Sequence, residues 1–181
     1  MKAVLLFFAL IAVPAVAQIK LPANETGQVQ YQEIVRIGDG KGPARQVFNQ
    51  LRLWTEEHYP KNEAELQFDE QHGIVFVRSL FPSDDQTVRY TLTVEARIGR
   101  YRATITDLVA EQKGGLAQPV RPVSSTVEEI ERAANGTTKN KVLVQQIAAN
   151  QAELYRQIDQ LCRATLASLK QSMTAATPAK P

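Results

Sequence analysis

Residues that commonly build metal, redox and catalytic centres are scarce in this sequence. Its 181 residues include one cysteine, Cys162, and two histidines, His58 and His72. A single cysteine excludes an internal disulfide, and neither histidine has Cys, Asp or Glu around it at a zinc-like spacing. We therefore predict no metal site and no cofactor. Cys162 is interpreted as a small apolar residue on a helix, with a reactive thiol or an intermolecular bridge as the alternative.

Net charge is also low. The formal net charge is +2 at pH 7, and removing an N-terminal segment whose only charged residue is Lys2 leaves the chain close to neutral. A protein that binds nucleic acid without regard to sequence needs a clustered basic surface that displaces counterions from the phosphates. The composition therefore argues against nucleic acid as a partner.

Long apolar runs are absent except at the N-terminus. Lys2 precedes an apolar run from Ala3 to Val13, and Ala15-Val16-Ala17 gives a small-x-small cleavage pattern before Gln18. These are the parts of a secretory signal peptide, and the run is too short to cross a bilayer comfortably, so an uncleaved anchor is the weaker alternative. We predict a signal peptide over residues 1–17 and an exported chain, periplasmic or secreted, with no transmembrane segment after cleavage.

No catalytic motif is present. The segment Gly38–Gly42 contains Lys41 but lacks the GxxxxGK[ST] spacing of a phosphate loop, and we interpret it as a strand-to-helix connection. Ser124-Ser125 lacks the G-x-S-x-G context of an exposed nucleophile. The acidic pairs are adjacent in sequence, and nothing indicates the desolvated carboxylate pair that acid–base catalysis requires. The sequence favours a protein that is not an enzyme.

The chain is organised around a long strand pair between Gln86 and Val109. Apolar and polar residues alternate from Thr87 to Ile98, and this period of two is typical of a half-buried β-strand. Gly99 and Arg100 then break the run as a turn, and the alternation resumes over Tyr101–Thr106. The pattern predicts a hairpin with one apolar and one polar face.

Other segments complete the sheet and cover it. Strands are predicted over Val29–Ile37, Ala64–Gln71 and Gly73–Phe81, with connections short enough for antiparallel pairing. A helix is predicted from Pro43 to Tyr59, with one apolar stripe for the sheet. The stripe residues are Ala44, Val47, Phe48, Leu51 and Trp54. The predicted fold class is α+β: an antiparallel sheet of about five strands, with helices covering one face.

The C-terminal third is expected to be helical. A linker over residues 113–124 follows a sheet domain of residues 18–112. Ser125 and Glu128 fit a capping box that opens a short helix through about Ala134.

A long helix is then predicted from Lys141 to Met173. At ~1.5 Å per residue it is about 50 Å long, more than a compact sheet needs. Two arrangements stay open: the helix packs back on the sheet, or it projects and pairs with another copy in a homo-oligomer. The two helices make a C-terminal extension over residues 125–173, and residues 174–181 are expected to be a disordered tail.

Several short segments resemble one protein family. They are Leu21-Pro22 before a Gly-x-Val-x-Tyr strand, the helix that ends near Trp54, the Gly73 turn and the run Tyr101-Arg102-Ala103-Thr104-Ile105-Thr106-Asp107. Over about Leu21 to Val109, the chain is similar to an exported family of unknown function with a TATA-binding-protein-like (TBP-like) fold, common in Bacteroidetes. The resemblance implies a curved antiparallel sheet with helices on one face. It implies no activity and no functional residues, and the fold name says nothing about DNA.

The polar face of the predicted sheet is the remaining candidate site, with Phe76 and Arg78 expected beside it. If both helices lie on the apolar side, this face can bind an anionic or carbohydrate ligand through charge-assisted and hydroxyl hydrogen bonds. The alternative is an ordinary solvated face whose charges pair with one another, as Glu95 can with Arg97. The candidate ligand-binding residues are Arg36, Arg89, Thr91, Thr93, Arg97, Arg102, Thr104 and Thr106.

Three functions are compatible with these observations. The first is an exported, non-enzymatic binding or assembly module that uses the open sheet face, the long helix or both on a protein or envelope partner. The second is a small hydrolase or transferase whose site does not show as a motif. The third is a structural oligomer built on the long C-terminal helix.

Overall fold

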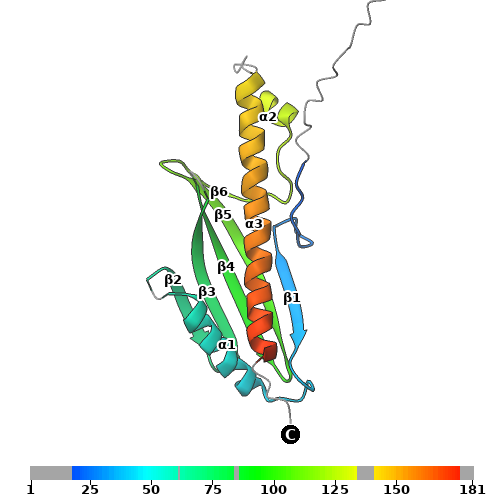
Figure 1. The fold of residues 1–181 in the computed structure, drawn as a ribbon, viewed down its shortest axis with the longest axis vertical. Coiled ribbons are helices and arrows are strands. Elements are labelled where there is room, and N and C mark those ends of the chain that lie inside the picture. The colour runs from blue at the N-terminus through cyan, green and yellow to red at the C-terminus, as the bar shows by residue number, and fades with distance from the viewer. Residues whose placement is uncertain (1–17, 61, 84–85, 134–140, 176–181) are drawn as a thin grey trace, which may run out of the picture.

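The computed structural model describes residues 18–60, 62–83, 86–133 and 141–175. Within them lies one antiparallel sheet with helices on one side (Figure 1). The strands are β1 (Tyr31–Arg36), β2 (Ala64–Asp69), β3 (Ile74–Ser83), β4 (Gln86–Arg97), β5 (Arg100–Gln112) and β6 (Ala117–Pro119). The helices are α1 (Ala44–His58), α2 (Val127–Ala133) and α3 (Lys141–Ala175). The predicted α+β class is confirmed, and the predicted signal peptide lies outside the described residues.

The sheet is a meander with the first strand of the chain added at one edge. Its order is β1-β5-β4-β3-β2, so β2 to β5 pair with their neighbours in sequence and β1 joins at the far edge beside β5. The sixth strand, β6, pairs with β5 as well. It lies inside residues 113–124, which we expected to be a linker only.

Each long strand separates its apolar and polar side chains as the alternation predicts. Val88, Leu92 and Val94 of β4 are buried on the helix side, which we call the inner face. Ile98 departs from the prediction, because it lies at the tip of the β4–β5 hairpin and is 69% exposed. A residue in the turn has no neighbouring strand beside it, so the alternation of buried and exposed residues ends with β4 at Arg97, one residue before Ile98.

The first helix covers one half of the inner face. α1 begins after Pro43 and ends before Pro60, as expected from the restrictions that proline places on the backbone. Its buried residues are Val47, Phe48, Leu51, Trp54 and Thr55, so the predicted stripe is confirmed apart from Ala44, which is only partly buried.

The two halves of the long helix α3 have different packing partners (Figure 1). From Leu154 to Met173 its buried side chains belong to the same apolar core as the sheet and α1. Val144, Ala148 and Ala152 are also buried but lie outside that core, in the half beside which α2 packs. The C-terminal half of α3 therefore packs back on the sheet, and its N-terminal half extends beyond the sheet core. Pairing with another copy stays a prediction. It also continues to Ala175, through two residues that we expected in the tail.

The start of α2 corrects the predicted cap by one residue. The Glu129 N–H donates to Thr126 Oγ1 (3.2 Å), and the Thr126 N–H donates to Glu129 Oε2 (3.0 Å), which is a reciprocal capping box. Ser125 has other partners: its N–H donates to Gln151 Oε1 of α3 (2.8 Å). Ser125 and Thr126 are both good caps, but the Ser125 hydroxyl accepts from Arg121 (2.7 Å) and is not used as the cap.

The start of the described chain is tied to the segment before α2. The Leu21 N–H donates to the Pro122 carbonyl (2.7 Å), and Ile19 exchanges hydrogen bonds with Ser124, donating to its hydroxyl (2.9 Å) and accepting from its N–H (3.0 Å). Leu21 is 1% exposed, so its side chain is part of the core. No helix in the described part of the chain is long and apolar enough to cross a membrane.

Candidate functional site

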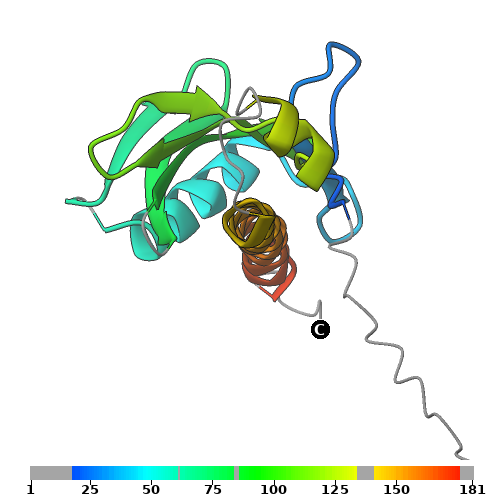
Figure 2. The same cartoon turned by 90° about the horizontal axis from the view of Figure 1, so that it is seen from above.

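The outer face of the sheet, opposite α1 and α3, is not covered by any element of the described chain (Figure 2). Strand register and exposure place all eight candidate ligand-binding residues on it, together with Phe76 and Arg78. The four arginines are exposed and the four threonines are half-buried. The sequence pattern therefore locates this surface correctly, whether or not it binds a ligand.

Threonines form the centre of the outer face. Thr91 lies opposite Thr106, Thr93 lies opposite Thr104, and Phe76 lies beside Thr93 on the next strand. Neighbouring strands are about 4.8 Å apart, so these side chains form a continuous uncharged patch. Their hydroxyls can both donate and accept hydrogen bonds.

Ion pairs surround this threonine patch. Glu95 accepts from Arg102 (2.6 Å) and from Arg97 (3.2 Å), and Arg89 donates to Glu111 (2.9 Å). On the next two strands of the sheet, Arg78 of β3 donates to Glu65 of β2 (3.4 Å). These ion pairs neutralise only part of the charge that made this face a candidate for anions, because Glu95 is shared by two arginines. The sequence showed that Glu95 can pair with Arg97, but the shorter contact to Arg102 depends on strand register.

Two arginines at one end of the outer face differ from the rest. Arg36 and Arg100 are exposed and have no carboxylate partner among the described residues. They line a cavity of about 530 Å³ with Arg97 and the Gly38-Asp39-Gly40 loop. Sequence reasoning missed Arg100 because it follows the turn glycine and was assigned to the turn.

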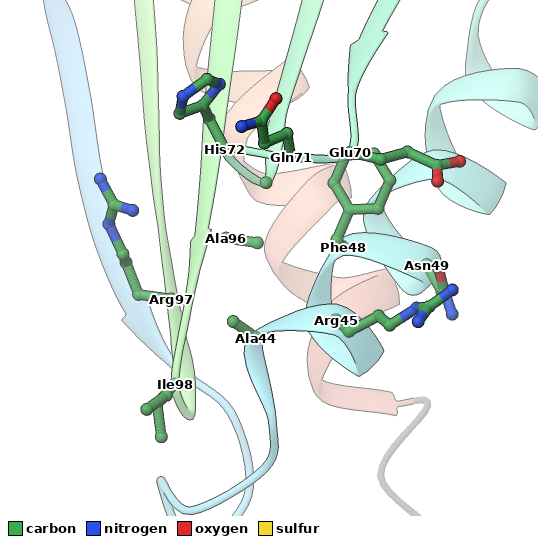
Figure 3. A pocket seen from close by; sticks show the side chains of 11 residues that line it. Ala44, Arg45, Phe48, Asn49, Glu70, Gln71, His72, Ala96, Arg97 and Ile98 are labelled. Atoms are coloured by element: carbon green, nitrogen blue, oxygen red, sulfur yellow. The ribbon is translucent and has the colours of Figure 1, made fainter.

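A second cavity, of about 650 Å³, lies between α1, the β2–β3 turn and the β4–β5 tip. Figure 3 shows that its polar side chains diverge: Arg45 and Arg97 point away from each other, and His72 and Gln71 point away from both α1 and the tip. The His72 Nδ1 atom lies 2.8 Å from Asp69 Oδ2, outside the cavity lining. Groups that do not converge on a point cannot position a reacting atom together.

Titratable groups on the inner face serve packing and local hydrogen bonds. The Tyr31 hydroxyl donates to Asp159 Oδ1 (2.9 Å), which also accepts from Arg163 Nε (2.9 Å). Burial raises the pKa of the Cys162 thiol to about 12, and the residue is 0% exposed. Cys162 is thus a protonated core residue, as the helix pattern predicted.

The remaining histidine, His58, stacks on Trp54 with ring centroids 4.8 Å apart. Partial burial lowers its pKa, because desolvation disfavours the charged imidazolium. Within the ranges that the structure describes, no group of three or more His, Cys, Asp and Glu residues is arranged to hold a metal ion.

Comparison with known proteins identifies the fold. No family model matches the sequence, and no curated protein matches it. Among solved structures, the chain is similar to a TBP-like protein from Parabacteroides distasonis, with a TM-score of 0.54 and 17% identity over 82% of this chain and 96% of that one. It is also similar to a DUF4468 family protein from Bacteroides ovatus, with a TM-score of 0.50 and 15% identity over 89% of this chain and 94% of that one. The predicted resemblance to TBP-like proteins is confirmed at the level of the fold: the chain has a TBP-like α+β fold, with its helices on one side of an antiparallel sheet.

Proposed function

We propose that this protein is an exported, non-enzymatic binding module that holds a partner of the cell envelope on the outer face of its sheet. The observation that carries the proposal is the asymmetry of the sheet. Both α1 and α3 pack on the inner face, and no described element covers the outer one (Figure 2).

The composition of the outer face supports a binding surface. Its centre is uncharged and rich in hydroxyls, with Phe76 at its side, and ion pairs to glutamates neutralise part of the surrounding arginine charge. Threonine has low side-chain entropy to lose on binding because it is branched at Cβ. The uncharged centre of such a surface can accept the hydrogen-bonding groups of a protein or glycan.

Export with cleavage after Ala17 is compatible with the contacts of the first described residues. The Gln18 side chain donates to the Ser124 carbonyl (2.9 Å), and Ile19 bonds the same residue. The expected cleavage after Ala17 would therefore leave every one of these contacts intact. Expression of the full chain in a bacterial host, followed by N-terminal sequencing of the fractionated product, tests this. A product that begins at Gln18 outside the cytoplasm supports export, and a full-length cytoplasmic product contradicts it.

The binding role is tested with one substitution at the centre of the outer face and one matched control. Thr93→Arg places a long charged side chain on the threonine patch, whereas Gln160→Arg places the same side chain on the exposed surface of α3. Purified mature protein is sedimented with the insoluble envelope fraction of its source cells. We expect Thr93→Arg to reduce the bound fraction severalfold and Gln160→Arg to leave it unchanged, with melting temperatures confirming that both variants fold. Equal binding by both variants contradicts the proposal.

A second candidate function, a structural oligomer, is favoured by the N-terminal half of α3. Ile147 there is 45% exposed, on the stretch of helix that lies beyond the sheet core. An exposed apolar residue on a projecting helix suits a coiled-coil-like contact with another copy. Light scattering of the mature protein and of Ile147→Glu tests it. A dimer or larger species that becomes monomeric in the variant supports the oligomer, and a monomeric wild-type protein excludes it.

A further inference from the structure

We propose that Arg36, Arg97 and Arg100 form a binding site for a phosphate group at one end of the outer face. The inference deepens the proposed function and rests on it, since it assigns a ligand chemistry to part of the same binding surface.

Strand register brings the three arginines into one row. Arg36 of β1 lies opposite Arg100 of β5, and Arg100 lies opposite Arg97 of β4. Directly opposed residues in an antiparallel pair project to the same face, so the three guanidinium groups leave the sheet together. Three strands span about 10 Å, which is a distance that arginine side chains can close around one small ligand. In Figure 3, Arg97 is directed away from Arg45 of α1, toward the outer side.

The walls of this arginine site are fixed by backbone contacts. The Ile37 N–H donates to the Gly99 carbonyl (2.9 Å), and the Gly99 N–H donates to the Gly42 carbonyl (2.7 Å). Gly99 has a φ of +61°, and a Cβ added to it would lie 1.9 Å from the Gly40 carbonyl oxygen. The hairpin tip and the glycine loop are therefore in direct contact, and only glycine fits between them. The arginines project from a rigid frame around a cavity of about 530 Å³.

Charge at the site is unbalanced. Two carboxylates are near: Asp39 lines the cavity and accepts from the Lys41 N–H (3.0 Å), and Glu95 binds Arg97 but lies closer to Arg102. Neither forms an ion pair with Arg36 or Arg100, within the part of the chain that the structure describes. Like charges directly opposite each other destabilise a sheet. A protein that keeps such a row gives up stability at this position, which is common where a surface binds a ligand.

The chemistry of the row suits phosphate. Guanidinium groups present planar pairs of N–H donors that match phosphate oxygens. A phosphate group carries close to two negative charges at neutral pH and has three strong acceptor oxygens, so it can accept from more than one arginine at a time. A carboxylate has one charge and two oxygens and leaves part of the row without a partner.

The test measures thermal stability of the mature protein in sodium phosphate, and in sodium chloride and sodium acetate at equal ionic strength. We expect phosphate, at a concentration well above its dissociation constant, to raise the melting temperature by about 2–4 °C more than chloride or acetate does. The Arg36→Gln/Arg100→Gln variant should lose this response and should melt at a higher temperature than the wild-type protein without phosphate. The control is Arg45→Gln/Arg132→Gln, which removes the same charge from exposed helix positions and should keep the response.

Two results overturn the proposal: a melting temperature in phosphate no higher than in chloride and acetate, or a phosphate response that survives in Arg36→Gln/Arg100→Gln. When the response is present, vesicles of phosphatidylcholine with and without phosphatidic acid, a lipid with a terminal phosphate group, separate the sources of phosphate. Sedimentation with phosphatidic acid vesicles that is lost in the same variant assigns a lipid headgroup, and its absence assigns a phosphorylated soluble ligand. If phosphate has no effect while Thr93→Arg still abolishes envelope binding, only this site fails. If phosphate binds but the envelope fraction does not, the proposed function fails and the site stands.

Discussion

The two faces of the sheet are stabilised by different interactions. The inner face holds its helices by burying aliphatic and aromatic side chains, of which Leu92, Ile105 and Ile158 are 0% exposed. The outer face carries ion pairs whose arginines are about half exposed, and such pairs contribute about 0–1 kcal/mol each. Stability therefore depends mainly on the inner face, and substitutions on the outer face are expected to cost less.

The largest expected difference comes from the same substitution made on both faces. Ile105→Ala on the inner side of β5 should lower the free energy of unfolding by about 2–5 kcal/mol, because it leaves a cavity in a packed core. Ile34→Ala on the neighbouring strand β1 removes the same atoms from a residue that is 59% exposed, and should change it by about 0.5 kcal/mol or less. Urea denaturation of both variants measures the difference. Similar losses would show that the outer face is covered in solution.

Alkaline pH should weaken the inner face. The pKa of the Cys162 thiol is raised by burial from its ordinary value near 9 to about 12, so the unfolded state releases this proton at lower pH than the folded state. The stabilisation is complete below about pH 9 and is lost as pH rises toward 12, with a slope approaching ~1.4 kcal/mol per pH unit. Urea denaturation from pH 8 to 11 measures the slope, and Cys162→Ala is the control. Parallel pH profiles of the two proteins would contradict the assignment.

A smaller effect of opposite sign is expected at Tyr101. Its side chain is 1% exposed, and its hydroxyl has no hydrogen-bond partner among the described residues. An unsatisfied buried hydroxyl costs about 1–3 kcal/mol. Tyr101→Phe should therefore stabilise the protein by about 1 kcal/mol, seen as a higher midpoint in urea with an unchanged slope. Destabilisation would mean that the hydroxyl has a partner in solution.

The smallest effect is expected from Glu95→Gln on the outer face. The substitution removes the carboxylate shared by Arg97 and Arg102, and the cost should stay below about 1 kcal/mol because both arginines remain hydrated. High salt should reduce the difference from the wild-type protein, since screening weakens exposed pairs. A larger cost that resists salt would assign these ion pairs a structural role.

Much of the fold follows from local patterns in the sequence. The period of two in β4 and the apolar stripe of α1 predict both the elements and the faces that they bury, because burial repeats with the geometry of the backbone. The beginning and end of α1 follow from Pro43 and Pro60. These features depend on residues a few positions apart, so no long-range information is needed.

Other features depend on contacts between distant segments. β6 forms because residues 117–119 lie beside β5. Thr126 caps α2, whereas Ser125 bonds Arg121 through its hydroxyl and Gln151 of α3 through its N–H. A register shift between β4 and β5 places Asp107 at a φ of +54°, which a strictly alternating strand would not include. Nothing in the local pattern indicates these contacts.

The candidate site likewise has some features that the local sequence predicts and others that depend on contacts between strands. Alternation alone places Thr91, Thr93, Thr104 and Thr106 on one face. The pairing of Glu95 with Arg102, and the absence of such a partner at Arg100 among the described residues, depend on register across strands. The sequence therefore predicts where the surface lies but not which of its charges remain available.

The place of β1 in the sheet also has a consequence for the rate of folding. β2 to β5 pair in sequence order and close short loops, whereas Tyr31 of β1 lies opposite Ile105 and Leu21 bonds Pro122. Contacts between distant residues form slowly, because chain entropy is lost before the contacts contribute. Leu21 and β1 must therefore wait until β5 and Pro122 have been made before they can join the sheet. For a protein that crosses a membrane unfolded, as the proposed export requires, this delay keeps the chain competent for translocation during the synthesis of residues 18–122.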